Sequence, residues 1–117
     1  MNVSSLLPHR APMLLIDEII EWDLESKTLV AAKNIGENEF FLQGHYPDFP
    51  IVPGVITCEM IFQAGAALIS LLLQNQSIKG SIDSIKGKVP VVTRCNQIKF
   101  REMIRPNDTV LLSVALT

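Results

Sequence analysis

The pattern of hydrophobic and polar residues begins with two short segments that favour β-strands. Residues 13–22 are rich in Leu and Ile, with acidic residues between them, and residues 28–35 follow a polar, turn-like segment. Residues 36–49 predict a loop that has room for one helical turn. We therefore expect a β-rich N-terminal part that leads through this loop into the middle of the chain.

The middle of the chain predicts one long helix. Prolines at positions 47, 50 and 53 exclude a helix until the last of them, so Pro53 and Gly54 should begin it, and the apolar pattern continues to about Gln74. The helix is apolar nearly all round, and its small residues 64–67 would let another backbone approach closely. The apolar run 61–73 is too short to span a bilayer, so we expect a buried core helix.

The last third of the chain predicts more β-structure. Residues 75–88 are polar and glycine-containing, which favours a loop, whereas residues 89–103 alternate as a long strand. Residues 105–108 form a turn motif before a final β-branched-rich strand at 109–116. Together these elements predict an α+β fold, in which an antiparallel sheet curls around one central helix, in a single domain spanning residues 1–117.

Composition adds an uneven distribution of charge to this picture. Of 117 residues, 48% are hydrophobic, so part of the apolar surface could be buried in a subunit interface. A net charge of −2 argues against general nucleic-acid binding. Residues 1–59 carry a local charge of −6, and residues 79–105 a local charge of +5. This basic region fits either an anionic partner that docks on one face or a solvated strand edge.

The two cysteines and the N-terminus favour a cytoplasmic protein. Cys58 and Cys95 have no metal-like spacing and provide no disulfide framework, so reduced thiols are expected. The first residues show no basic region followed by a long apolar stretch, as a signal peptide would have. No phosphate-binding loop, dinucleotide fingerprint or metal-ligand cluster is present, so we expect no metal and no cofactor.

The strongest candidates for chemistry are His45 and Glu59. His45 lies in the proline-stiffened loop, and Glu59 is a lone carboxylate on the second turn of the apolar helix. A base that titrates near neutrality and an acid whose pKa would rise on burial suit proton transfer. The alternatives are a structural loop histidine and a glutamate that pairs with an arginine or faces an interface.

The predicted helix supplies further candidates. Free N–H groups at Gly54 and Val55 could hold a carbonyl oxygen that becomes anionic, although any helix start has such groups. Gln63, one turn beyond Glu59, could hydrogen-bond that carboxylate or be a satisfied core glutamine.

Three other residues are not expected to carry chemistry. His9 should be structural, because nothing acidic lies near it in the sequence. Cys58 points about 100° around the helix from its neighbour Glu59, which makes a nucleophilic role improbable. Trp22 fits ordinary packing at a strand end.

With those residues in view, nearly the whole chain resembles the (3R)-hydroxyacyl-[acyl-carrier-protein] dehydratases of the FabZ type. The resemblance is carried by the opening segment, by the loop and helix that hold the candidate pair, and by the later strand and turn: residues 7–17, 41–47, 53–55, 59–64, 98–101 and 105–108.

The resemblance implies a hotdog fold, in which a sheet wraps around a long helix, and an active site at a dimer interface. His45 of one subunit would take a proton from C2 of the acyl thioester. Glu59 of the other subunit would protonate the departing C3 hydroxyl, directly or through water, and the Gly54 amide would polarise the thioester carbonyl. A glutamate at position 59 favours this branch over relatives that carry aspartate there and also isomerise the double bond.

The resemblance also implies partners: a second copy of the chain, in a homodimer or larger homo-oligomer, and an acidic acyl carrier protein that presents the substrate. We expect no nucleic acid and no membrane span. The basic residues expected to dock the carrier protein are Lys86, Lys88, Lys99, Arg101 and Arg105.

Two departures from the family pattern bear on activity. Tyr46, Asp48 and Phe49 replace the residues expected at the tunnel mouth, and the chain ends at Thr117, where the family usually continues through two further strands. Two alternative functions therefore stay open: a hotdog acyl thioesterase, and a non-catalytic hotdog subunit that binds acyl carrier protein.

Overall fold

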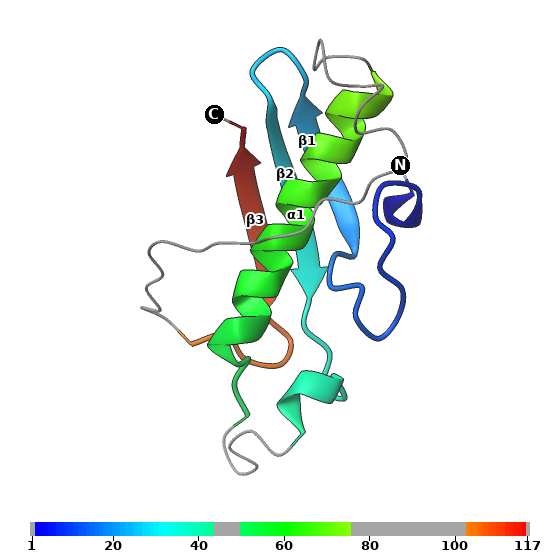
Figure 1. Cartoon of the computed structure of the whole chain (residues 1–117). Helices are drawn as coiled ribbons and strands as arrows, with labels where there is room; N and C mark the ends of the chain where they lie inside the picture. The colour runs from blue at the N-terminus through cyan, green and yellow to red at the C-terminus, as the bar shows by residue number, and fades with distance from the viewer. Residues whose placement is uncertain (1, 44–49, 76–102, 117) are drawn as a thin grey trace.

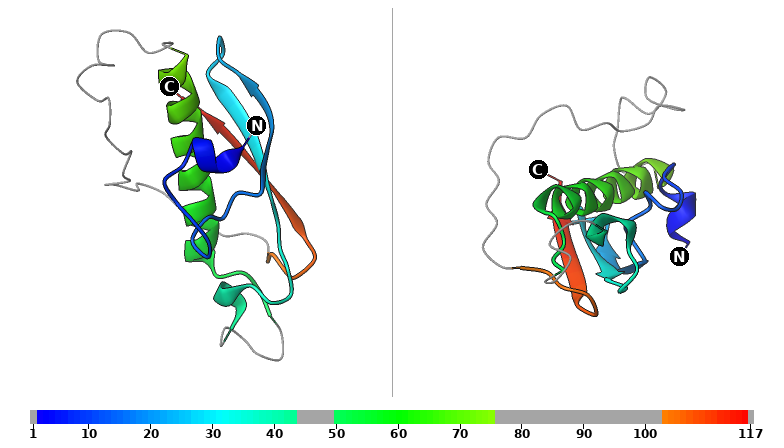
Figure 2. Two further views of the ribbon diagram at one scale, coloured as in Figure 1. Left: turned by 90° about the vertical axis from the view of Figure 1, so that its right-hand side faces the viewer. Right: turned by 90° about the horizontal axis from the view of Figure 1, so that it is seen from below.

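The computed structural model consists of two layers, a three-stranded antiparallel sheet and one long helix. It describes residues 2–43, 50–75 and 103–116. The sheet order is β1 (Glu18–Asp23), β2 (Thr28–Asn34) and β3 (Thr109–Ala115). Helix α1 (Gly54–Gln74) lies along one face of this sheet, as Figures 1 and 2 show. Two short 3₁₀ segments, η1 (Val3–Ser5) and η2 (Phe40–Leu42), flank the layers.

The sheet buries one face against α1. Leu29 pairs with Val114 and Ala31 pairs with Leu112, and Leu29, Ala31 and Leu112 are at most 4% exposed. Successive strand residues point to opposite faces, so their neighbours Ala32 and Leu111 lie on the outer face. The β1–β2 register shifts between residues 19 and 21, which is a β-bulge.

Helix α1 begins and ends where the sequence predicts. Pro53 is the N-cap residue, with an extended backbone, and Gly54 is the first helical residue. Asn75 ends the helix by donating both its backbone N–H and its side-chain amide to the carbonyl of Leu71. The buried residues recur at helical spacing: Met60, Gln63, Ala64, Ala67, Leu68, Leu71 and Leu72.

The expectation that α1 is a core helix is confirmed. The expectation that its apolar part is too short to span a bilayer is wrong. The helix has 21 residues, and an 18-residue window within it has a mean hydropathy of 1.8, so it is long and apolar enough to cross a membrane by length and composition alone. What makes it a core helix is its packing, because its buried stripe belongs to the same hydrophobic cluster as Leu29 and Leu112.

The small residues of the helix divide between its two sides. Ala64 and Ala67 are completely buried, as expected for a close approach to a neighbouring element. At Gly65 an added Cβ would meet nothing within 4 Å, so no other backbone approaches this position closely in the described part of the single chain. Gly65 therefore lies on the outer side of α1.

The first strand is shorter than the sequence predicts. Strand pairing begins at Glu18, and Met13 and Leu14 instead donate their backbone N–H groups to the carbonyl of Arg10. The turn that starts at Arg10 prevents these residues from joining the sheet.

The other elements predicted within the described residues are confirmed, and the expected loop at 75–88 lies outside those residues beyond Asn75. Strand β2, the helical turn η2, the 105–108 turn and strand β3 all form. Of the expected strand 89–103 only Met103 is described, and it is not in a strand.

Candidate active site

The central contact of the candidate site joins two residues of α1. Glu59 lies on the second turn of the helix, and Gln63 follows one turn later. The side-chain amide of Gln63 donates to Oε2 of Glu59, with Nε2 and Oε2 2.9 Å apart. The predicted contact between these two side chains is therefore confirmed.

Gln63 is at the same time a satisfied core glutamine, only 1% exposed. Its Nε2 also donates to the carbonyl of Met13 at 2.7 Å, and its Oε1 accepts from the backbone N–H of Leu15 at 2.8 Å. Gln63 therefore both hydrogen-bonds the Glu59 carboxylate and is a satisfied core glutamine, the two roles that the sequence left open. Gln63 ties the Glu59 carboxylate to the N-terminal segment 13–15.

The N-terminal segment also brings His9 to Glu59, which the sequence analysis missed. Nε2 of His9 lies 3.8 Å from Oε2 of Glu59, and the two side chains are 29% and 32% exposed. The backbone around His9 is held by Arg10, whose Nη1 donates to the carbonyls of Leu7 and His9. The sequence separation of 50 residues hid this pair, and only the segment's contacts with α1 reveal it.

The single chain leaves the Glu59 carboxylate partly open. About one third of its side chain is exposed, so the described residues of one chain do not form the dry cleft expected around this acid. His45, its expected partner in proton transfer, lies outside the described residues.

The start of α1 provides N–H groups that the helix itself does not use. Ile56 and Thr57 donate to the carbonyl of Pro53, whereas Gly54 and Val55 precede the first helical hydrogen bond. These amides carry the positive end of the helix dipole. Glu59 follows Gly54 by five residues, about 7.5 Å along the helix axis. The same helix therefore presents a carboxylate and two N–H groups that have no acceptor within the helix.

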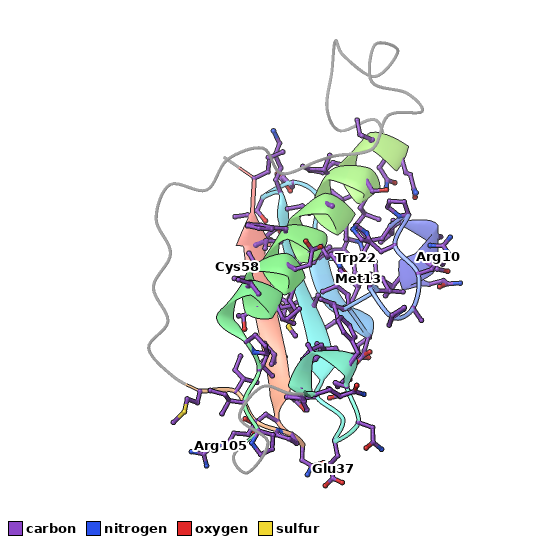
Figure 3. The ribbon with its side chains drawn as sticks, turned by 60° about the horizontal axis from the view of Figure 1, so that its bottom comes forward. Arg10, Met13, Trp22, Glu37, Cys58 and Arg105 are labelled. Carbon is purple, nitrogen blue, oxygen red and sulfur yellow. The ribbon has the colours of Figure 1, made fainter. Side chains whose placement is uncertain are left out.

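Of the expected carrier-docking residues, the structure describes only Arg105. It is exposed and precedes β3, and its backbone N–H donates to Oδ2 of Asp108. The neighbouring carbonyl of Ile104 accepts from the N–H of Val52, which connects this turn to the approach of α1. Figure 3 shows Arg105 at the end of the molecule where α1 begins. Four residues lie outside the described ranges: Lys86, Lys88, Lys99 and Arg101.

Cys58 lies as the sequence suggests, whereas Trp22 packs less than expected. Cys58 has a half-buried free thiol on the side of α1 away from Met13 and Arg10 (Figure 3). Trp22 stands near the end of β1 but is 45% exposed, so it packs only partly. Within residues 2–43, 50–75 and 103–116, no three His, Cys, Asp or Glu side chains gather as metal ligands.

Comparison with known proteins places these residues in a family context. Residues 7–117 match the model of the FabA-like domain. The chain is 37% identical over 111 residues to the 3-hydroxyacyl-[acyl-carrier-protein] dehydratase FabZ of Chlamydia muridarum, covering 95% of this chain and 67% of that protein. It is 40% identical over 115 residues to the FabZ of Oenococcus oeni, covering 98% and 75%. For the FabZ of Chlamydia caviae the identity is 39% over 109 residues, covering 93% and 66%. The chain thus spans about two thirds to three quarters of the length of these relatives.

Proposed function

Because the chain belongs to the family of FabA-like domains, with the hotdog fold, we propose that it is a hydro-lyase acting on acyl thioesters. Its substrates are (3R)-3-hydroxyacyl groups carried on acyl carrier protein, and its products are trans-2-enoyl thioesters in fatty-acid or related acyl-chain synthesis. Its similarity to several FabZ dehydratases over more than nine tenths of the chain supports this assignment. The observation that carries it is the Glu59 carboxyl group, fixed by Gln63 near the start of a helix.

The proposed reaction removes one proton from C2 and delivers another to the leaving hydroxyl group, so that the substrate loses one water molecule. His45 removes the proton from C2, and the electron pair of that C–H bond forms the C2–C3 double bond. The C3–O bond breaks as Glu59 donates its proton to the departing hydroxyl, which leaves as water. The Gly54 and Val55 amides stabilise the negative charge on the thioester oxygen. Return of the proton from His45 to the Glu59 carboxylate through water restores both groups, and these steps call for no metal or cofactor.

The same proposal includes a homodimer or larger homo-oligomer, with His45 of one subunit facing Glu59 of the other. The outer side of α1 supports it, because Val55 is 73% exposed and Ile61 is 45% exposed. An apolar partner surface over this side would cover these residues and exclude water from Glu59. A cytoplasmic location and docking of the acidic carrier protein beside Arg105 belong to the same proposal.

The direct test is the ultraviolet absorbance of the conjugated enoyl thioester, formed from a short 3-hydroxyacyl thioester by the purified protein. His45→Ala should abolish it, and Glu59→Gln should lower kcat by about 10²–10⁴-fold, the usual contribution of a general acid. Cys58→Ser is the matched control, because the half-buried thiol is next to Glu59 in sequence but points about 100° around the helix from it. Circular dichroism should show native secondary structure in all three variants.

Three results would redirect the assignment. Full activity in His45→Ala would refute it. Release of free thiol without enoyl absorbance would identify a thioesterase that uses Glu59 to activate water. Inactive wild-type protein that gains activity with a second hotdog chain would identify a non-catalytic subunit.

A further inference from the structure

His9 and Glu59 belong to different parts of the chain, and no step of the proposed reaction requires them to meet. Their side chains nevertheless lie together, with Nε2 of His9 3.8 Å from Oε2 of Glu59. This distance is longer than a hydrogen bond, but contacts in active sites without substrate are often long and tighten when substrate binds. A small rotation of the imidazole would bring Nε2 into hydrogen-bonding range.

The other nitrogen of the ring restricts the protonation of His9. Nδ1 is buried and has no hydrogen-bond partner in the described part of the chain. A proton on Nδ1 would bury an N–H group without an acceptor, and a doubly protonated ring would bury part of a positive charge as well. The neutral tautomer with its proton on Nε2 avoids both costs, and it points an N–H group toward Glu59.

The segment that carries His9 is held firmly. Pro8 fixes the preceding backbone, and the Arg10 guanidinium binds the carbonyls of Leu7 at 2.8 Å and His9 at 2.7 Å. Gln63 fixes the same segment further along, through Met13 and Leu15. The imidazole therefore approaches Glu59 from a scaffold that is itself anchored to α1.

We propose that His9 is a positioning residue for Glu59: neutral and protonated on Nε2, it shares Oε2 with Gln63 and thereby leaves Oε1 as the oxygen that delivers the proton. An oxygen that accepts from two N–H donors has no free direction for its own proton toward the substrate. On this proposal the acid proton of Glu59 resides on Oε1, the oxygen that neither donor occupies. This inference rests on the proposed function, because the delivered proton is the one that the leaving hydroxyl receives.

Two substitutions separate this role from simple packing. His9→Phe keeps a ring of similar size but has no N–H donor, and it should lower kcat about tenfold, the kinetic equivalent of one hydrogen bond, with KM unchanged. His9→Gln keeps a neutral N–H donor at similar reach and should restore most of kcat. Wild-type kcat in His9→Phe together with low kcat in His9→Gln would overturn the inference, because packing alone predicts that order.

A second measurement is independent of turnover and of the stability of these variants. Nitrogen-15 NMR of the wild-type imidazole should show His9 at neutral pH as the Nε2–H tautomer, and Glu59→Gln should shift its Nε2 signal. A proton on Nδ1, or an Nε2 signal unchanged in Glu59→Gln, would disprove the contact. Wild-type protein that forms no enoyl product would instead remove the proposed function, while the NMR result still decides whether His9 binds Glu59.

Discussion

Gln63 holds Glu59 from one turn further along α1, with 2.9 Å between Nε2 and Oε2, and the same amide group binds the backbone of Met13 and Leu15. The candidate acid is therefore fixed by a residue that also anchors the N-terminal segment to the core helix. Stability of the fold and orientation of the acid depend on one buried side chain.

Replacing Gln63 by Leu should lower the free energy of unfolding by about 2–4 kcal/mol. The substitution replaces the amide by an apolar side chain of similar size and leaves the buried Leu15 N–H and the partly buried Met13 carbonyl without a partner, at about 1–3 kcal/mol each. Urea denaturation measures the change. Gln74→Leu is the matched control on the same helix, because Gln74 is exposed and makes only a long contact, 3.4 Å, to Ser5. Equal losses in the two variants would contradict the role assigned to Gln63.

Charge reversal at Arg105 should weaken use of carrier-bound substrate. Arg105→Glu is expected to raise KM for an acyl carrier protein substrate by about three- to tenfold at low salt, and by less at high salt, because exposed charges are screened. A short thioester without carrier protein should show no change in KM.

Lys27→Glu is the control for this charge reversal. Lys27 is exposed in the β1–β2 turn, beside Thr28, which pairs with Ala115 at the far end of β3 from Arg105. An equal rise in KM for Lys27→Glu would show that net charge, rather than docking at Arg105, controls the effect.

The β1–β2 turn should lose stability on acidification. The hydroxyl of Ser26, with the backbone N–H groups of Ser26 and Glu25, holds the pKa of Asp23 below its ordinary value of 3.8. A pKa lowered in the folded state stabilises the fold above the unfolded value of about 3.9, and this stabilisation disappears as pH falls through the folded value.

NMR titration of the Asp23 carboxyl group tests this prediction, and a midpoint at or above 3.8 would contradict it. The stability difference between the wild type and Asp23→Ala should likewise be constant above about pH 5 and shrink below about pH 4.

The two sides of α1 should respond in opposite directions to added volume. Ala67→Leu should cost about 1–3 kcal/mol, because Ala67 is completely buried and a larger side chain overpacks the core. Gly65→Ala should gain about 0.5–1 kcal/mol in the isolated chain, since the new Cβ meets open space and alanine favours a helix.

Thermal unfolding and light scattering test this pair together. A neutral Ala67→Leu would contradict the packing described here. A destabilising Gly65→Ala that also lowers the oligomeric state would place Gly65 in a subunit interface and disprove its gain in stability.

Local chemistry explains which parts of the fold were predictable. Pro53 and Gly54 fix the start of α1 because proline excludes a preceding helix, and the apolar pattern carries the helix to Gln74. Residues four apart on a helix are neighbours, so the contact between Glu59 and Gln63 follows from their spacing alone. The error at β1 arose because the hydrophobic composition continues upstream of Glu18, whereas the backbone N–H groups of Met13 and Leu14 bind the carbonyl of Arg10 and not a neighbouring strand.

The sequence by itself determined the helix, the turn before β3 and the placing of an acid one turn before a glutamine, because each depends on residues close together in the chain. Only the tertiary structure decided that His9 meets that acid and that Lys33 is 7% exposed, with Nζ 3.1 Å from Glu39 and 3.5 Å from Asp17. These charged and polar partners come from separate segments. Their encounters are consequences of how the segments pack around the buried face of α1, and no spacing along the chain encodes that packing directly.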